Sequence, residues 1–301
     1  MKWKKLGCVF YPDCQHPKLQ SHAANPLAIP LKDNIFRVLY SGRDKNNRSS
    51  VGFVDIDIYK QAVIYSHMEP IFMHGDPGSY FSHGVSIGNS YKSNFNTYIL
   101  FMGWSIASGE HWRGNIGRLV LQKAHFLALT PEAPLISCDS EDPVSLSYPW
   151  VIFDQGIYKM WYGSTVCWDA GNGEMIHIIK YATSTDAIHW QKHGQAIPHV
   201  IGVAQAFSRP SVIVDRNGYH MWFSYRDGSG KTYRIGYAHS KDGLSWDMEK
   251  HQSGIDVSNS GWDSEMIEYP FVFDHKGNRY MLYNGNDYGR TGFGLATLES
   301  D

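Results

Sequence analysis

Three stretches of the sequence repeat one another closely. They are Tyr148-Pro-Trp-Val-Ile-Phe-Asp-Gln-Gly-Ile-Tyr-Lys-Met-Trp-Tyr162, Arg209-Pro-Ser-Val-Ile-Val-Asp-Arg-Asn-Gly-Tyr-His-Met-Trp-Phe223 and Tyr269-Pro-Phe-Val-Phe-Asp-His-Lys-Gly-Asn-Arg-Tyr-Met-Leu-Tyr283. Their prolines are 61 and 60 residues apart, and each proline precedes a methionine by 11 residues. Each stretch reads as an apolar strand, a turn containing Asp and Gly, and a second aromatic strand. The sequence therefore predicts a β-hairpin that recurs about every 60 residues.

Two weaker copies of the hairpin lie upstream, at residues 25–40 and 83–104. Each of the five units continues into a third strand, and these strands begin at Val51, Ile116, Ile178, Ile235 and Gly292. In two units a related turn then leads to a tryptophan that opens a fourth strand, Trp190 and Trp246. Four-stranded repeats arranged radially form the blades of a propeller. We therefore expect an all-β fold, a five-bladed β-propeller with four-stranded antiparallel blades, as a single domain over residues 1–301.

The two ends of the chain complement each other in this scheme. The sequence stops soon after the third strand of the fifth unit, so that blade lacks its outer strand. The N-terminal stretch Trp3-Lys-Lys-Leu-Gly7 resembles Trp190-Gln-Lys-His-Gly194, which opens a fourth strand. We expect residues 3–10 to complete the last blade and close the ring, because closure removes two exposed sheet edges.

Composition narrows the possible partners. The chain has 301 residues, a formal net charge of −2 and 43% hydrophobic residues. A charge near zero argues against a nucleic-acid partner. No apolar run approaches the ~18 residues of a membrane span, and the N-terminus lacks the apolar core of a signal peptide, so we expect a cytoplasmic protein without a membrane partner. Neither the cysteines nor the histidines have the spacing of metal ligands, and we expect neither a metal nor another cofactor. The oligomeric state stays open.

The predicted topology locates a pocket. In a four-stranded meander the start of the first strand and the end of the second lie on the same face, so the residue before each blade proline, or its counterpart, lies near the central axis. The axial residues are then Asn25, His83, Tyr148, Arg209 and Tyr269. The turns on the same face contribute Arg43, Trp104, Arg226, Asp227 and Asn286. A repeat needs no such polar variety at one position, and hydroxyls, amides and arginines beside a tryptophan suit a sugar ligand.

The blade pattern resembles that of a known superfamily. A proline that opens strand one, a turn containing Asp and Gly, Tyr-x-Met-Trp-Tyr and then Ser-x-Asp-Gly-x-x-Trp are similar to the five-bladed propellers of glycoside hydrolase families 43, 32 and 130. The resemblance implies an axial pocket in which carboxylates at the blade openings cleave glycosidic bonds, by hydrolysis or, in one branch, by phosphorolysis. Asn25 stands where families 43 and 32 have an aspartate, and Tyr148 and Arg209 stand where a second is often found. The usual catalytic carboxylates are therefore not carried over.

Few residues remain that can act as acid, base or nucleophile. Position 268 is a glutamate where the matching positions of the other units, Ala24, Ser82, Ser147 and Ser208, are small. We predict Glu268 as a general acid, with Glu265, Asp227, Asp44 or Asp287 as the second carboxylate. Tyr148 or Tyr269, activated by Glu268, is an alternative nucleophile. The predicted substrate-binding residues are Asn25, His83, Arg209, Tyr269, Arg43, Arg226, Trp104, Asn286 and Asp227. An ion pair between Arg209 and Glu268 is the structural alternative.

Three functions remain open at this point. The first is a glycoside hydrolase-like enzyme that acts on an oligosaccharide or sugar conjugate. The second is a glycoside phosphorylase or glycosyl-transferring enzyme, in which arginines hold an anionic group. The third is a non-catalytic glycan-binding propeller.

Overall fold

The strands follow one another in consecutive antiparallel groups of four, as the 60-residue repeat predicts. The computed structural model describes residues 1–14, 16–107, 110–123, 125–228 and 230–299. The first group contains β2 (Ser21–Lys32), β3 (Ile35–Arg43), β4 (Ser49–Asp57) and β5 (Ala62–Ser66). The second contains β6 (Gly84–Ser93), β7 (Asn96–Ile106), β8 (Trp112–Gln122) and β9 (Phe126–Leu129).

The next two groups have the same order of pairing. The third contains β10 (Ser145–Asp154), β11 (Ile157–Cys167), β12 (Ile176–Ser184) and β13 (Gln191–Gln195). The fourth contains β14 (Ala206–Asp215), β15 (Gly218–Arg226), β16 (Arg234–Ser240) and β17 (Trp246–Met248), followed by the 3₁₀ turn η1 (Lys250–Gln252). The expectation of an all-β fold is confirmed.

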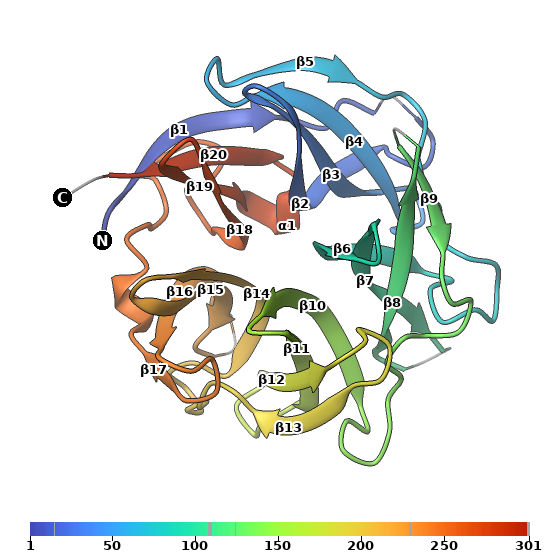
Figure 1. The fold of residues 1–301 in the computed structure, drawn as a ribbon, viewed down its shortest axis with the longest axis vertical. Helices are drawn as coiled ribbons and strands as arrows, with labels where there is room; N and C mark the ends of the chain where they lie inside the picture. The colour runs from blue at the N-terminus through green and yellow to red at the C-terminus, as the bar shows by residue number, and fades with distance from the viewer. Residues whose placement is uncertain (15, 108–109, 124, 229, 300–301) are drawn as a thin grey trace.

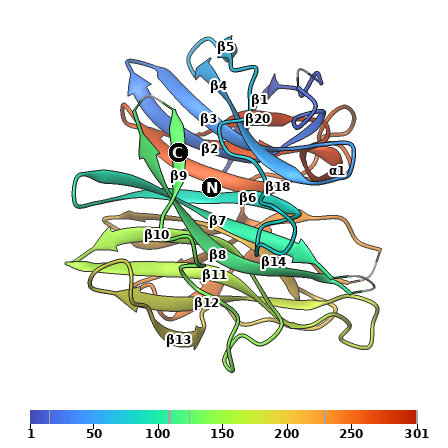
Figure 2. The ribbon, with the colours of Figure 1, turned by 90° about the vertical axis from the view of Figure 1, so that its right-hand side faces the viewer.

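The fifth group joins the two ends of the chain. It contains β18 (Glu268–His275), β19 (Asn278–Asn284) and β20 (Phe293–Leu298), and β1 (Trp3–Phe10) pairs antiparallel with β20. A four-residue helical turn, α1 (Asn286–Gly289), follows β19 and lies at the right-hand edge of the molecule in Figure 2. Among the described residues, no helix has the length and apolar character needed to cross a membrane.

The five groups stand around a common centre, with the first strand of each nearest to it (Figure 1). Hydrogen bonds join each group to the next. Ser41 Oγ accepts a hydrogen bond from the Ile87 amide. The side-chain amide of Asn89 donates to the Val151 carbonyl and accepts from the Val151 amide. Trp150 Nε1 donates to the Val212 carbonyl. Further bonds run from the Val272 amide to Ser211 Oγ, and from the Asn25 amide to Asn284 Oδ1. The last of these ties the fifth group to the first.

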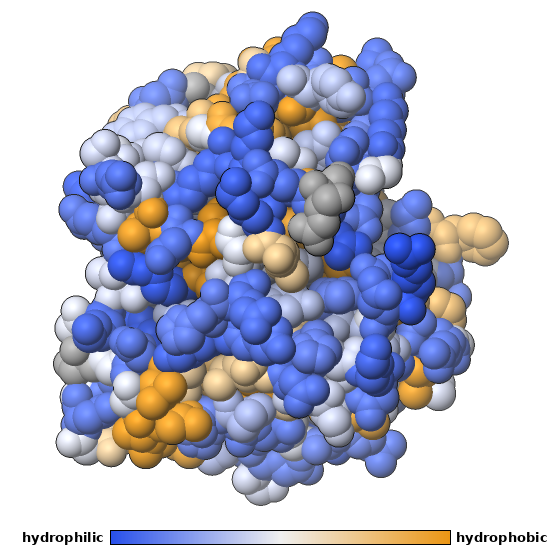
Figure 3. Space-filling view, turned by 90° about the vertical axis from the view of Figure 1, so that its left-hand side faces the viewer, coloured by the Kyte–Doolittle hydropathy of each residue, from blue (hydrophilic) through white to orange (hydrophobic). Residues whose placement is uncertain are grey.

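Apolar side chains fill the space between and within the groups. The two largest fully buried side chains are Trp161 and Trp222, which occupy matching positions in two copies of the repeat. The surface on the side of the two termini is mostly hydrophilic, with small apolar patches (Figure 3). The aromatic strands that recur in each copy thus form the core. The positions at which the copies carry different polar residues lie at the centre and on the surface.

A bulge in the first strand of each group turns one residue toward the centre. Asn25, Tyr148, Arg209 and Tyr269 each have a positive φ, between 35° and 58°, and the strand pairing is irregular at each of them. This left-handed conformation is unfavourable for residues with a side chain, and bulges of this kind re-aim side chains beside functional sites. These four residues therefore occupy equivalent bulges in the first strands of their groups.

The second group differs from the prediction that His83 is its axial residue. Its bulge falls between Ile87 and Ser90, so Gly88 and not His83 occupies the axial position. A Cβ on Gly88 would lie 2.4 Å from the carbonyl oxygen of Pro149, which explains why a glycine stands there. His83 lies five residues earlier, just before β6, where its Nδ1 accepts a hydrogen bond from the Ile106 amide.

Candidate active site

A pocket of about 390 Å³ opens at the centre of the five groups. Every group contributes to its wall. Six of the residues predicted from the sequence line it: Asn25, Arg43, Trp104, Tyr148, Arg226 and Tyr269. The lining also includes residues that the sequence did not single out as site residues: Trp112, His177, Ser208, Tyr233 and Tyr288. The described part of the lining contains neither aspartate nor glutamate.

Glu268 lies directly behind this wall. Its side chain is fully buried at the start of β18, and neither carboxyl oxygen has a hydrogen-bond partner in the part of the chain that the structure describes. Burial raises the pKa of Glu268 well above its usual value, and the nearby charges of Arg43 and Arg226 only partly oppose this. Burial raises the pKa of Tyr269 and Tyr148, and an ionised Glu268 would raise both further. Burial therefore favours the protonated form of Glu268, within electrostatic reach of the pocket.

Some residues of the pocket lining also carry unpartnered polar atoms. Asn25 Oδ1 and Ser208 Oγ are buried without a hydrogen-bond partner, and both residues line the pocket. Asn25 belongs to the first group and Ser208 to the fourth, on either side of the fifth group that carries Glu268. Arg226 Nε is also unpartnered. Buried polar groups are nearly always satisfied in folded proteins, so this cluster marks the part of the pocket wall that a polar ligand would satisfy.

Arg209 has a different environment from the one predicted. Its guanidinium is fully buried and donates to the carbonyl oxygens of Pro26 (2.7 Å), Tyr269 (3.2 Å) and Gly88 (3.3 Å). It thereby ties the fourth group to the first, the fifth and the second. Burial lowers the pKa of Arg209 to about 9. The ion pair with Glu268 considered from the sequence does not form, because both Glu268 oxygens are unpartnered.

Two arginines face the pocket itself. Arg226 donates to Glu174 Oε1 at 2.8 Å, and its guanidinium lies 4.7 Å from the ring centre of Tyr233. Arg43 donates to Asn47 Oδ1 at 2.8 Å, and in the described residues it has no carboxylate within ion-pair distance. Glu174 was missed from the sequence, because it lies in an irregular turn between β11 and β12 that has no counterpart in the other copies. The pocket therefore carries excess positive charge at Arg43.

His177 is a further pocket residue that the repeat did not reveal. Its Nε2 lies 2.6 Å from Ser147 Oγ, and its Nδ1 lies 2.7 Å from Thr165 Oγ1. Burial lowers the pKa of His177 to about 3, so the imidazole is neutral. A Cβ on Gly163 would collide with both Ser147 Oγ and His177 Nε2. The available signal was a histidine inside the third strand of one copy, next to the glycine that makes room for it.

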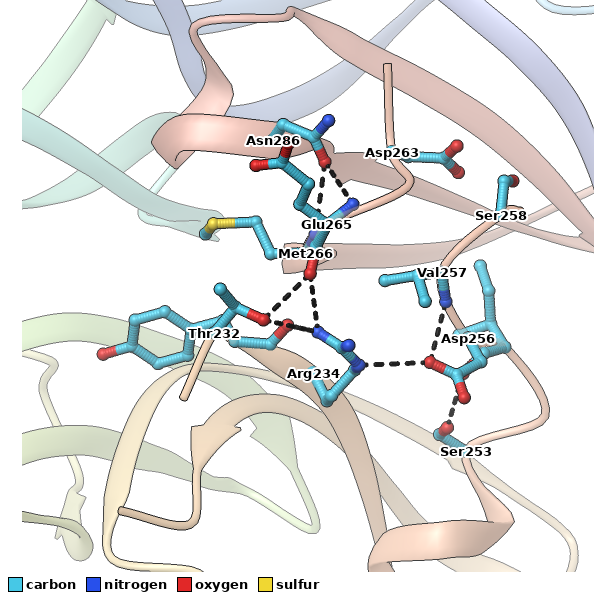
Figure 4. A network of polar contacts seen from close by, with 12 residues as sticks. Thr232, Arg234, Ser253, Asp256, Val257, Ser258, Asp263, Glu265, Met266 and Asn286 are labelled. Atoms are coloured by element: carbon cyan, nitrogen blue, oxygen red, sulfur yellow. Dashed lines mark hydrogen bonds and ion pairs between the residues drawn. The ribbon is translucent and has the colours of Figure 1, made fainter. Parts of the chain in front are cut away.

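Three further predicted residues lie outside the pocket lining. Glu265 is exposed in the loop before β18, and its amide donates to Asn286 Oδ1 at 2.8 Å (Figure 4). The same oxygen accepts from the Met266 amide at 3.2 Å, so Asn286 anchors this loop. Asp227 is half-buried just after β15. The roles predicted for these residues remain predictions.

The helical turn α1 forms part of the pocket rim. Asp287 and Tyr288 both have positive φ, 55° and 57°, within this turn. Consecutive left-handed residues with side chains are costly and cluster at functional sites. Tyr288 lines the pocket, and the charge of Asp287 raises the pKa of Glu268 further, after the larger effect of burial. In the described residues, no group of three His, Cys, Asp or Glu side chains has the geometry of a metal site.

Comparison with known proteins places this protein in a family. It is 43% identical over 302 aligned positions, and 100% of each sequence, to proteins of two strains of Mycobacterium tuberculosis that are named "Uncharacterized protein Rv1502" and "Uncharacterized protein MT1551". This protein belongs to the family of these mycobacterial proteins. No protein-family model matches it.

Solved structures show the wider relationship of the fold. One, titled "Glycoside hydrolase", matches with a TM-score of 0.77 at 12% identity, covering 99% of this protein and 92% of the other. A glycosyl hydrolase from Bacteroides ovatus matches at 0.69 and 12% identity, covering 99% and 90%. A structure whose title concerns the GH130 family of mannoside phosphorylases matches at 0.70 and 12% identity, covering 99% and 90%. The resemblance to the propeller glycoside hydrolase superfamily is confirmed, and identities this low establish the fold alone.

Proposed function

We propose that this protein is a carbohydrate-active enzyme that acts on a glycosidic bond in the axial pocket. The fully buried, unpartnered carboxyl of Glu268 carries the proposal. Among the described residues no hydrogen bond accounts for that carboxyl, whereas a general acid needs a carboxyl that stays protonated near neutral pH. The fold we propose around it is a five-bladed propeller, a single domain over residues 1–301 whose ring is closed by β1.

The proposed chemistry places Glu268 on the leaving-group side of the bond. Its proton passes to the glycosidic oxygen as the bond to the anomeric carbon breaks, which leaves a carboxylate behind. The charges of Arg43 and Arg226 reach Glu268 and would stabilise that carboxylate. Tyr148 donates from its hydroxyl to that of Tyr269 at 3.2 Å. Burial raises the pKa of Tyr148, which suits a hydrogen-bond donor to the substrate better than a tyrosinate nucleophile.

A specific observation favours phosphorolysis or glycosyl transfer as a second candidate. Hydrolysis by the usual route needs two carboxylates that flank the bond, and the described pocket lining has none besides the acid behind it. The guanidinium groups of Arg43 and Arg226 could instead hold a phosphate through paired hydrogen bonds. A phosphate oxygen would then form the new bond to the anomeric carbon as the protonated sugar leaves, and the product would be a sugar 1-phosphate. A non-catalytic glycan-binding role is the third possibility.

One substrate panel separates these functions. Oligosaccharides of glucose, galactose and mannose are incubated with the enzyme, with and without inorganic phosphate, and the products are separated by chromatography. Cleavage without phosphate indicates hydrolysis, cleavage that requires phosphate indicates phosphorolysis, and binding without cleavage by any route contradicts the enzymatic proposal.

Glu268→Gln tests the acid on whichever substrate is cleaved. We expect the rate to fall by ~100-fold or more while binding is kept, because general acid catalysis typically contributes that much. Glu132→Gln, which removes an exposed carboxylate in the loop between β9 and β10, is the control and should keep the rate. A fully active Glu268→Gln enzyme would exclude Glu268 from the reaction.

A further inference from the structure

The wall of the pocket that faces Glu268 is aromatic. The groups follow one another around the centre (Figure 1), so the boundary between the second and third groups lies across from the fifth. Trp112 of the second group lines the pocket there, with its ring centre 6.1 Å from that of His177 in the third group. This side contrasts with the one formed by Asn25, Ser208 and Glu268, where the unpartnered polar atoms gather.

The aromatic wall continues beyond the pocket as a stack of rings. Trp112 packs edge-on against Trp168 with ring centres 4.9 Å apart, and Trp168 stacks on His111 at 4.5 Å and 19°. Trp112 and Trp168 are half-buried, and His111 is exposed. Next to the stack, the ends of β7 and β11 expose apolar side chains, Ile106 at 40% and Val166 at 49%. The rings therefore form an apolar surface that leads out of the pocket.

This stack is not needed to build the fold. None of its three rings belongs to the buried clusters that form the core between the strands. They lie in the loops and strand ends at 111–112 and 168, whereas the corresponding turns of the fourth and fifth copies contain tyrosines, Tyr233 and Tyr288, and no tryptophan. Large aromatic side chains that are left partly exposed beside a pocket are typical of ligand-binding surfaces.

We propose that the stack of Trp112, Trp168 and His111 binds a second sugar ring, on the leaving-group side of the glycosidic bond. This inference rests on the proposed function. A pyranose has an apolar face of C–H groups and an edge of hydroxyls, so it suits an aromatic surface on one side and hydrogen-bonding groups on the other. The ring that reacts must lie near Glu268, and the same ring cannot also reach His111 beyond the opposite rim. The substrate is therefore at least a disaccharide.

The test measures how much the second ring adds to binding. Isothermal titration calorimetry compares methyl glycosides of glucose, galactose and mannose with their disaccharides on the full-length protein; where a disaccharide is turned over, KM replaces Kd. We expect the best disaccharide to bind at least about tenfold more tightly than its monosaccharide. Trp168→Ala should remove most of this advantage and leave monosaccharide binding within about twofold.

Two further variants make the result decisive. Trp190→Ala removes a tryptophan of the same group, which packs against a core cluster, and should leave the ratio of disaccharide to monosaccharide affinity unchanged. His111→Ala removes an exposed ring and should weaken disaccharide binding several-fold even if Trp168→Ala proves unstable. An unchanged ratio in Trp168→Ala and His111→Ala, or a wild-type disaccharide no tighter than its monosaccharide, would overturn the second-ring site alone. If no sugar binds the wild-type protein, the proposed function fails together with it.

Discussion

Two fully buried carboxyl groups in this protein have opposite surroundings. Asp142, in the loop before β10, forms ion pairs with Lys180 at 2.8 Å and Lys192 at 2.6 Å, and also accepts hydrogen bonds from Ser164 and Tyr162. Glu268 is equally buried and has no partner. Burial alone would raise the pKa of both groups, but the bonds to Asp142 outweigh it and lower its pKa, whereas the pKa of Glu268 is raised.

The contrast separates structural from functional acids. A carboxylate that holds strands together is surrounded by donors, because an uncompensated buried charge is costly. The fifth group repeats the structural arrangement at its outer edge: Asp263 accepts from Lys5 at 2.7 Å and from Tyr283 at 3.0 Å. The same group therefore contains a saturated acid at its edge and an unsaturated one at the centre. The unsaturated one precedes Tyr269, which lines the pocket.

The largest expected effect comes from removing the strand that supplies Lys5. Deletion of residues 1–10 takes away β1, exposes the edge of β20 and leaves Asp263 without its lysine. It also removes Trp3, whose ring packs 5.7 Å from that of Trp222. We expect insoluble protein or a loss of several kcal/mol in the free energy of unfolding.

A milder variant keeps this deletion test interpretable. Trp3→Ala leaves the strand in place and should cost about 3–5 kcal/mol, because it empties a buried aromatic site. Thermal and denaturant unfolding measure both variants. A truncated protein that melts within a degree or two of the full-length form would show that β1 does not complete the fold.

Asp142→Asn should be the most damaging of the single carboxyl substitutions. It leaves Lys180 and Lys192 without their buried partner, and breaking such a pair typically costs about 3–5 kcal/mol. Asp139→Asn is the matched control, because Asp139 bonds the same Lys192 at 2.6 Å from an exposed position and should cost less than about 1 kcal/mol. Equal losses in the two variants would contradict the distinction between saturated and exposed acids.

The smallest effect on stability, and the most specific, is expected from Glu268→Gln as a function of pH. Because the folded-state pKa of Glu268 is raised, the folded protein holds this proton more tightly than the unfolded chain. Wild-type stability therefore falls as pH rises above the unfolded pKa, until the folded group also ionises. Glu268→Gln should match the wild type near pH 4 and exceed it in stability at higher pH.

Asp142 should change the pH dependence of stability in the opposite direction. Its folded-state pKa is lowered, so its stabilisation is present above the unfolded pKa and is lost as pH falls through the folded one. Unfolding curves of the wild type, Glu268→Gln and Asp142→Asn from pH 3 to 8 measure both trends. A Glu268→Gln protein whose stability stays parallel to the wild type over this range would mean that folding does not raise the pKa of Glu268.

Much of the fold could be predicted because each hairpin of the repeat is specified by residues close together in the sequence. The proline, the methionine eleven residues later and the turn between them recur with nearly constant spacing, and each reports one hairpin. The prediction of His83 as the axial residue was wrong in the second copy, where no proline marks the bulge. A tight contact with the Pro149 carbonyl requires a glycine, Gly88, at that position. The match between residues 3–7 and 190–194 was informative for the same local reason, and Lys5 and Lys192 do occupy equivalent places beside buried aspartates.

The candidate site was only partly predictable. Position along a strand identified the residues that the bulges turn inward, so Asn25, Tyr148 and Tyr269 are in the pocket wall. Position could not identify Glu174, His177 or Trp168, because they come from irregular turns and from a third strand whose neighbours are set by other groups. Sequence position also did not predict that Asn286 Oδ1 accepts hydrogen bonds from the amides of Glu265 and Met266.

The sequence by itself determined the all-β repeat, its period and four of the five residues at the strand bulges, because these depend on side-chain alternation and turn chemistry within about twenty residues. Only the tertiary structure decided which polar groups are satisfied. Arg209 finds three carbonyls from three other groups, and Asp142 finds two lysines, whereas Glu268 finds no partner. Burial and hydrogen bonding depend on residues brought together from the whole chain, and those two quantities turn a carboxyl group into a structural anion or a protonated acid.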